Sequence, residues 1–313
     1  NIYSHRQPFL INPFLERFTE ETGIKTNVVY ATKGLAQRLK AEGKNSPADV
    51  ILTVDIGRLY IYDDLDLLAS IESAVLDRNI PQNLKSPDNK WFALSKRSRI
   101  IVTSKERVKE GQITKIEELA KDEWKGKICS RPGSHIYNRA LLASLILSLG
   151  EKAAEEWAKK FVGNLARRPQ GNDRAQVKAI FEGQCDIALI NNYYFGKLKY
   201  SDDPKQREWA ESIRLIFPNQ GVNDRGAHIN ISGGGVVKYS KNKEEALALL
   251  EFLSKEESQK MYGDINFEYP VNPRVETTDE LKSWGSFKSD NLPIISIAKK
   301  AYDAQKIIDR VGW

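Results

Sequence analysis

Two adjacent tyrosines, Tyr193 and Tyr194, are the residues of this chain whose type and spacing point most directly to chemistry. They follow two asparagines and the apolar run CDIALI, which is typical of a buried strand. Open α/β sheets bind ligands beyond the carboxyl ends of such strands. Inside a strand the two side chains would point to opposite faces, but the asparagines favour a turn. We therefore expect both phenols to converge on one point.

Converging phenols suit a hard and highly charged cation. Tyrosine has an ordinary pKa of about 10, so a phenol keeps its proton near neutral pH unless something replaces it. A trivalent ion prefers hard anionic oxygen and would displace these protons, as bound metals deprotonate thiols and water. Ferric iron is the ion that this chemistry indicates. The alternative is packing, because tyrosine is amphipathic and suits half-buried positions.

Other patterns that could carry chemistry are sparse. The three histidines, His5, His135 and His228, have none of the close His or Cys partners that a zinc site requires. The motifs GxSxG, GxGxxG and HExxH and the P-loop are absent, so we expect no enzyme. The glycine run at residues 233–235 lacks the lysine and the spacing of a phosphate loop. It is more typical of a bulge or a hinge.

A basic run, KRSR at residues 96–99, directly precedes the strand-like segment IIVTS. It could place guanidinium groups at a cleft, but a solvated, charged strand end is the commoner pattern and the one we favour. Aromatic residues do not interleave with this run, and the 48 basic residues are interspersed with 42 acidic ones along the chain. We therefore expect no nucleic-acid partner.

Two cysteines, Cys129 and Cys185, each adjoin a short strand-like run. The chain starts at Asn1 without a charged and apolar leader, which we interpret as the mature form of an exported protein. An even number of cysteines in such a protein permits one disulfide. Two buried free thiols are the alternative.

Strand and helix patterns alternate along the chain, which predicts an α/β protein with parallel strands. The length of 313 residues exceeds the usual size of a single core, so we expect two lobes. The helices predicted in the second half of the alternation lie at residues 136–149, 152–162 and 174–182. Asp173 is expected to cap the last of them. The run HINISGGGVV at residues 228–237 is interpreted as a strand that returns from one lobe to the other.

These segments together resemble the periplasmic ferric-ion-binding proteins of bacterial ABC transporters. The resemblance spans the chain and is carried, in family order, by IYSHRQPFL, SPADVILTVD, WFALSKRSRIIV, WKGKICSRPGSHIYNRAL, CDIALINNYYFGKL and AHINISGGGVV. It implies an α/β fold, the two-lobed periplasmic-binding-protein clamshell with hinge crossing strands. We expect an N-terminal lobe of residues 1–98 plus 221–273 and a C-terminal lobe of residues 99–220 plus 274–313.

The resemblance also implies a set of site residues. The implied iron ligands are Tyr193, Tyr194 and the tyrosine of SHIYNRAL, Tyr137. Where relatives have a histidine ligand in the first lobe, this chain has Arg6 and Gln7, and where some have a glutamate ligand it has Val54. The resemblance therefore implies a bidentate synergistic anion, carbonate or bicarbonate, in the remaining coordination positions. Arg6 and Gln7 would hold this anion, and Arg97 would line the same cleft.

The function implied by the resemblance is that of a receptor and not of an enzyme. The protein would capture a single ferric ion, Fe(3+), with carbonate and deliver it to an inner-membrane ABC permease. It would act as a monomer in the periplasm after removal of its signal peptide. The alternative is a receptor of the same fold for another anion or for an organic iron chelate.

Overall fold

The computed structural model describes all 313 residues and divides them into two compact units. The first unit consists of Asn1–Lys96, Ile231–Ser283 and Pro293–Ile295, and the second of Arg97–Asn230, Trp284–Leu292 and Ser296–Trp313. Four segments fall on the other side of the expected boundaries: residues 97–98 and 221–230 belong to the second unit, and 274–283 and 293–295 to the first. The reason is that two of the boundaries lie inside continuous strands, where no change of composition marks them.

The sheet of the first unit begins with three parallel strands. The strand β1 (Ile2–Ser4) pairs in parallel with β2 (Val28–Tyr30) and with β3 (Val50–Thr53), and β3 pairs antiparallel with β8 (Ile229–Val236). All four residues of β3 are buried, which accounts for the continuous apolar run of this segment.

Close backbone contact explains the glycine run of β8. A Cβ atom placed on Gly233, Gly234 or Gly235 would lie 2.5 Å from a backbone carbonyl oxygen, that of Phe92, Ile51 or Lys90 respectively. Only residues without a side chain fit at such distances. The run is therefore a packing feature of the sheet, and it forms neither a phosphate loop nor a bulge.

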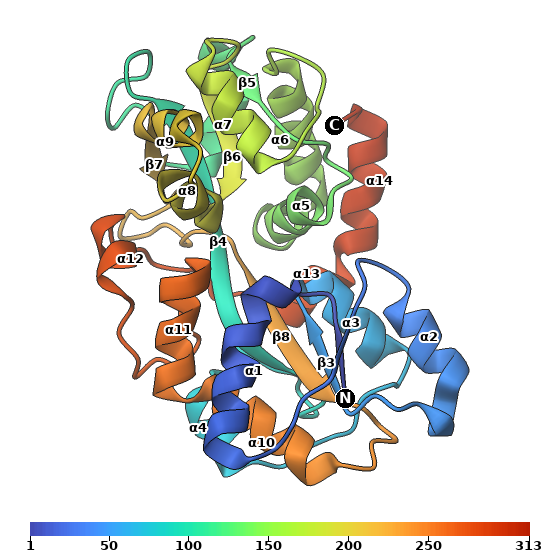
Figure 1. Cartoon of the computed structure of the whole chain (residues 1–313). Coiled ribbons are helices and arrows are strands. Elements are labelled where there is room, and N and C mark those ends of the chain that lie inside the picture. The colour runs from blue at the N-terminus through green and yellow to red at the C-terminus, as the bar shows by residue number, and fades with distance from the viewer. The chain divides into compact units, whose positions relative to one another are not determined.

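Amphipathic helices pack around the sheet of the first unit (Figure 1). In α1, Ile11, Phe14, Leu15 and Phe18 recur at helical spacing and are buried, and the helix ends at Gly23, whose φ is 73°. This helix packs against α10 and α11, and α10 packs against α4. The helices of this unit are α1 (Pro8–Thr22), α2 (Leu35–Glu42), α3 (Ile56–Asp64), α4 (Ala74–Asn79), α10 (Lys243–Ser254), α11 (Glu256–Asn266) and α12 (Asp279–Ser283).

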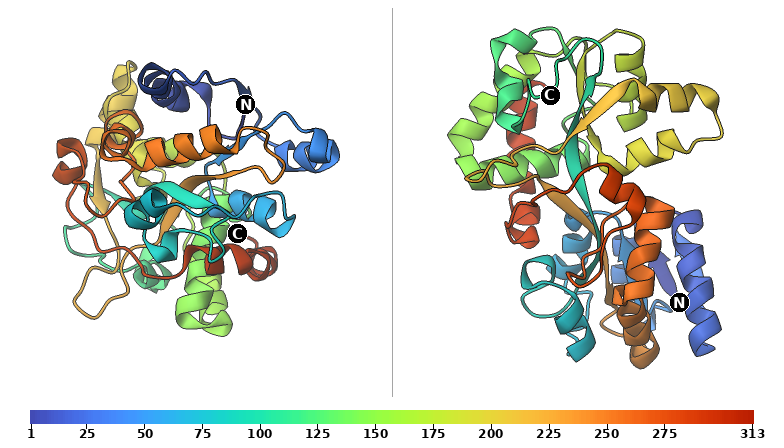
Figure 2. Two further views of the ribbon diagram at one scale, coloured as in Figure 1. Left: turned by 90° about the horizontal axis from the view of Figure 1, so that it is seen from below. Right: turned by 90° about the vertical axis from the view of Figure 1, so that its left-hand side faces the viewer.

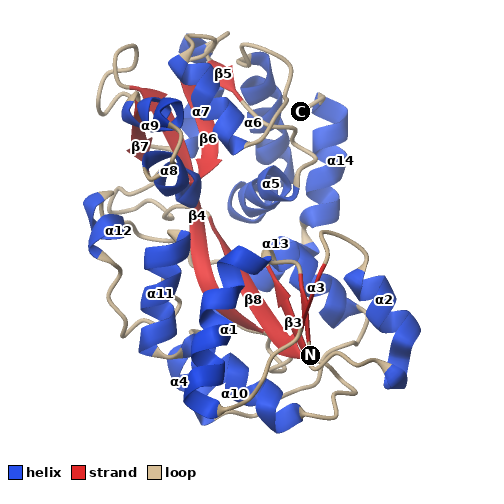
Figure 3. Ribbon diagram, viewed as in Figure 1, coloured by secondary structure: helices blue, strands red, loops and turns tan.

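The second unit is built around β6 (Ile187–Asn191) and the carboxyl half of β4 (Phe92–Ser104), which pair antiparallel. The strand β7 (Ile213–Ile216) pairs with β4, and β5 (Ile128–Cys129) pairs in parallel with β6. Helices flank these strands (Figure 3), and α7 packs on β6. The helices are α5 (Ile136–Leu149), α6 (Glu151–Gly163), α7 (Asp173–Phe181), α8 (Asn192–Lys199), α9 (Pro204–Glu211) and α14 (Ala301–Val311).

Two long strands belong to both units. The strand β4 starts in the first unit and passes into the second at Arg97, and β8 returns to the first unit at Ile231 (Figure 2). The return strand expected at residues 228–237 is thus confirmed. The short helix α13 (Ile294–Lys299) also falls on a boundary between the units. No helix has the length and apolar character needed to span a bilayer.

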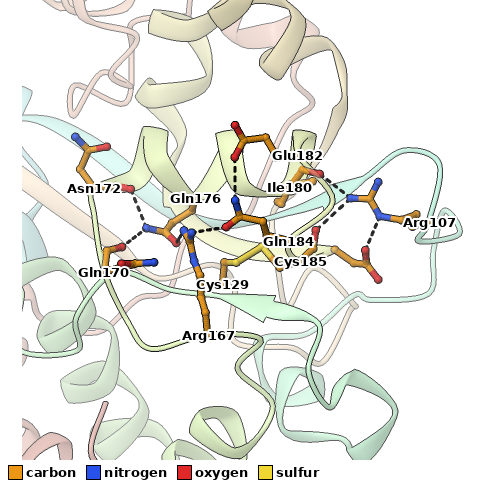
Figure 4. Close-up of a disulfide and its surroundings, with 11 residues drawn as sticks. Arg107, Cys129, Arg167, Gln170, Asn172, Gln176, Ile180, Glu182, Gln184 and Cys185 are labelled. Carbon is orange, nitrogen blue, oxygen red and sulfur yellow. Dashed lines mark hydrogen bonds and ion pairs between the residues drawn. A yellow bond between two sulfur atoms is a disulfide. The ribbon is translucent and has the colours of Figure 1, made fainter.

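Cys129 and Cys185 form a disulfide, which is one of the two states that the sequence left open. Their Cα atoms lie 5.8 Å apart, and both residues are buried in the apolar core of the second unit. Beside the disulfide, Arg107 donates hydrogen bonds to the backbone oxygens of Ile180 and Cys185 (Figure 4). The disulfide links β5 to the segment just before β6, and β6 is the strand that leads to the paired tyrosines.

Candidate metal centre

Three tyrosines come together in the second unit. Tyr193 and Tyr194 lie in the first turn of α8, directly after β6, and Tyr137 is the second residue of α5. The Tyr193 hydroxyl donates a hydrogen bond to the Tyr137 hydroxyl at 3.0 Å. The ring centroids of Tyr193 and Tyr194 are 4.5 Å apart. The structure therefore brings together the three tyrosines that the sequence and the resemblance singled out.

Local sequence explains how these side chains converge. Asn191 is the last residue of β6 and the N-cap of α8, so the chain changes from strand to helix just before the tyrosine pair. In a helix, adjacent side chains are about 100° apart around the axis, so they need not point to opposite faces as they do in a strand. The other tyrosine is placed by His135, whose side chain accepts a hydrogen bond from the Tyr137 backbone N–H and so caps α5.

The spacing of the hydroxyls matches that of two ligands on one metal ion. Bonds of about 2.0–2.2 Å, the length that oxygen makes to zinc, place two ligands at right angles about 2.8–3.1 Å apart. The hydroxyl oxygens of Tyr137 and Tyr193 are 3.0 Å apart. No group of three or more His, Cys, Asp or Glu side chains is placed to hold a metal.

Burial keeps two of these phenols protonated at neutral pH. Burial raises the pKa of Tyr193 well above its ordinary value, and the neighbouring Tyr137 and Tyr194 raise it further. Burial, followed by the effect of Tyr137, raises the pKa of Tyr194 to about 12. A cation that binds these oxygens must therefore displace protons, which a hard, highly charged ion does best.

Three buried guanidiniums surround the Tyr137 ring. Those of Arg97, Arg99 and Arg131 lie 5.5, 5.9 and 5.1 Å from its centroid. Arg97 and Arg99 are each only 2% exposed, so the expectation of a solvated strand end was wrong. They lie two residues apart on β4, so both point to the same face, toward the interior of the second unit. This alternation in KRSR was the signal in the sequence that could have revealed them.

A buried carboxylate binds two of the arginines. Asp173 is fully buried and accepts hydrogen bonds from Arg99 Nη1 at 2.6 Å, from Arg131 Nη1 at 3.0 Å and from the Asn191 backbone N–H at 2.8 Å. The expectation that Asp173 caps a helix was wrong, because the N-cap of α7 is Asn172. Sequence reasoning missed Asp173 as a site residue, since an aspartate at a helix start has the pattern of a cap.

A recess beside this cluster carries a positive charge. It is tightly packed, with no room for a water molecule, and its lining residues are Arg97, Arg99, Tyr137, Asn191, His228 and Asn230. Burial, followed by Arg225 and Arg99, lowers the pKa of His228 to about 3, so this histidine is neutral. Asp173 forms ion pairs with two of the three arginines, Arg99 and Arg131.

Arg6 and Gln7 belong to the first unit, so the structure does not bring them into the same unit as the tyrosines. Arg6 is buried and donates from Nη2 to Glu268 Oε2 at 2.8 Å, and its guanidinium lies 5.2 Å from the Tyr262 ring centroid. Gln7 is exposed and is the N-cap of α1. The neighbouring His5 bonds to the Ala31 carbonyl oxygen through Nδ1. Arg6 therefore has an internal carboxylate that balances its charge.

Known proteins share this fold and much of this sequence. Iron uptake protein A1 of Synechocystis is 42% identical over 314 residues, which cover 100% of this chain and 87% of that protein. Ferric iron-binding protein A of Mannheimia haemolytica, solved in an open conformation, superposes with a TM-score of 0.94 at 45% identity, over 100% of this chain and 98% of that one. IdiA (FutA) of Trichodesmium, solved in complex with iron and citrate, superposes with a TM-score of 0.95 at 46% identity, over 100% and 99%.

These similarities confirm the resemblance to ferric-ion-binding proteins and the two-lobed α/β fold expected from the sequence. The family model described as bacterial extracellular solute-binding protein matches residues 3–260. The chain belongs to the family of bacterial extracellular solute-binding proteins.

Proposed function

We propose that this protein is the receptor of a bacterial ferric-iron importer and binds one ferric ion through Tyr137, Tyr193 and Tyr194. The observation that carries the proposal is the set of three converging phenols, two of them 3.0 Å apart, within a frame of buried guanidiniums. Phenolate oxygen is a hard anionic donor that suits a trivalent ion. The names of the Synechocystis and Mannheimia relatives, which refer to iron, support the same assignment.

Carbonate, or bicarbonate that loses its proton, completes the proposed site. Three phenolates balance the charge of a ferric ion, and the guanidiniums of Arg97, Arg99 and Arg131 around Tyr137 favour an additional anion. A bidentate dianion would fill two further coordination positions. Arg97 would hold it from the second unit, and Arg6 and Gln7 remain the proposed contacts from the first.

The same proposal covers delivery and location. A solute-binding protein of this family would act as a monomer in the periplasm and pass the ion to an inner-membrane ABC permease. Release at the permease then requires that the phenols recover their protons. The test is transport by a cell that lacks this receptor and is supplied with either the wild-type protein or Tyr193→Phe. Equal ferric-iron uptake with both proteins would contradict the delivery role.

The visible absorption spectrum tests the ligand assignment. Ferric-phenolate bonds give a broad charge-transfer band, so the protein with ferric iron and bicarbonate should be coloured. Tyr193→Phe should lose much of the band, because this change removes one ligand oxygen. Tyr200→Phe is the matched control, since Tyr200 follows the same helix but is 57% exposed. A colourless wild-type protein would contradict iron binding by tyrosine.

An organic iron chelate is the second candidate ligand, favoured by one observation. The Trichodesmium relative was solved in complex with iron and citrate. If citrate replaces carbonate here, the band should form with ferric citrate and be absent with ferric iron and bicarbonate. If the band forms fully with bicarbonate in citrate-free buffer, carbonate suffices and the chelate is not required.

A further inference from the structure

One arginine next to the proposed ligands contacts both of the segments that carry them. Arg99 donates from Nε and from Nη2 to Asn138 Oδ1, at 3.2 and 2.8 Å. It also donates from Nη1 to Asn191 Oδ1 at 3.2 Å and to Asp173 Oδ2 at 2.6 Å. Arg99 is only 2% exposed, and all four contacts lie within the second unit.

Each asparagine is bound closely to a tyrosine segment. Asn138 is the residue after Tyr137 in the first turn of α5. Asn191 ends β6 two residues before Tyr193, and its Nδ2 donates to the Tyr193 hydroxyl at 3.3 Å. Tyr137 and Tyr193 are 56 residues apart in sequence, so no local structure fixes the spacing of their two segments. The guanidinium of Arg99 connects them directly.

Asp173 holds this guanidinium in place. Its Oδ2 accepts both from Arg99 and from the Asn191 backbone N–H, at 2.6 and 2.8 Å, while its Oδ1 accepts from Arg131. The carboxylate is therefore bound to three groups, and Arg99 is held at the angle that reaches both asparagines. A buried ion pair adds little net stability compared with an apolar pair of similar size, whereas the planar fork of arginine fixes geometry.

We propose that Arg99 is a positioning residue of the tyrosine cluster: it sets the distance between Tyr137 and Tyr193 before the metal arrives. This inference rests on the proposed function, since it concerns the same three tyrosines. Arg99 acts through Asn138 and Asn191 and need not contact the metal. Preorganised ligands bind more tightly because less ordering remains to be done on binding.

Arg99→Lys tests this role, because lysine keeps the charge and loses the planar fork. Loss of an outer-shell partner of a metal ligand typically weakens metal binding by about 10–100-fold. We expect a loss of ferric-iron affinity in this range and a shifted or broadened charge-transfer band. Arg107→Lys is the matched control, since Arg107 lies in the same unit and binds Asp186 and the backbone oxygens of Ile180 and Cys185. It should keep both affinity and band.

The band separates positioning from general stability. If Arg99→Lys binds iron within about threefold of wild type and gives the same band, the proposal is wrong. If Arg99→Lys does not fold, Asn138→Ala decides, because it removes both hydrogen bonds from Arg99 to the Tyr137 segment and leaves the hydrogen bond from Asn191 to the Tyr193 hydroxyl in place. We then expect a weaker and shifted band, and an unchanged spectrum would overturn the proposal.

A metal-free measurement makes this proposal independent of iron binding. In a crystal structure of metal-free Arg99→Lys, the hydroxyls of Tyr137 and Tyr193 should no longer lie 3.0 Å apart. Retention of that distance would refute the positioning role, whatever the ligand is. Absence of a charge-transfer band in the wild-type protein would instead refute the proposed function.

Discussion

Proton displacement provides the sharpest test of phenolate ligation. Burial raises the pKa of Tyr193 well above its ordinary value and that of Tyr194 to about 12. Both phenols thus stay protonated in the metal-free protein across the whole neutral range. Each phenol that becomes a ligand must release one proton, so the apparent affinity falls about tenfold per pH unit for each ligand. The two buried phenols, Tyr193 and Tyr194, therefore predict a loss of about 10² between pH 7.5 and pH 6.5.

Competition with a chelator of known pH dependence measures this slope. Ferric-iron affinity would be determined at several pH values between 6.5 and 7.5 with a constant concentration of carbonate, because bicarbonate can add a proton of its own. Tyr193→Phe should lower the slope by one proton, and Tyr200→Phe should leave it unchanged. The slope is that of the logarithm of the affinity against pH. A slope below about one, or the same slope in wild type and Tyr193→Phe, would refute the reasoning from phenol burial.

Three further changes have predictable effects on stability. Cys129→Ser removes a disulfide between residues 56 apart in sequence and should lower the free energy of unfolding by about 4 kcal/mol. In a denaturant titration, wild type with its disulfide reduced should match the variant. Gly234→Ala should cost about 1–3 kcal/mol, because its Cβ would lie 2.5 Å from the Ile51 carbonyl oxygen; a thermal midpoint equal to that of wild type would contradict this. The phenols of Tyr193 and Tyr194 have pKa values raised by folding, so their contribution to stability is complete below about pH 10 and is lost as the pH rises toward 12. In urea titrations of metal-free protein, the difference in stability between wild type and Tyr194→Phe should therefore stay constant below about pH 10 and change only in the alkaline range.

Periodic patterns made much of the architecture predictable. The apolar spacing of Ile11, Phe14, Leu15 and Phe18 predicts α1, and the buried run at residues 50–53 predicts β3, because each element buries one face in a core. The paired tyrosines were found for a related reason. They follow a buried strand, and the position of a residue after such a strand is a local property of the sequence.

The arginine and aspartate frame was not predictable in the same way. Arg97 and Arg99 have the pattern of a charged strand end, and Asp173 that of a helix cap, and both patterns are usually solvent-exposed. Arg99 and Asp173 are buried as a pair across segments 74 residues apart, and no local signal in the sequence marks such a pairing. Tyr137 was found only by resemblance for the same reason, since its partner Tyr193 lies on another helix.

Under the proposed function, burial of the phenols favours a trivalent ion over a divalent one. With a pKa of about 12, removal of the Tyr194 proton at pH 7 costs about 7 kcal/mol, and the Tyr193 proton is also held tightly. A cation must offset this cost through its attraction to the phenolates, and that attraction grows in proportion to its charge. A trivalent ion gains half as much again as a divalent ion at the same distance, while both displace the same protons. The protonated cluster thus opposes divalent ions more strongly than ferric iron, and the hydroxyl oxygens of Tyr137 and Tyr193 already lie 3.0 Å apart, at ligand spacing.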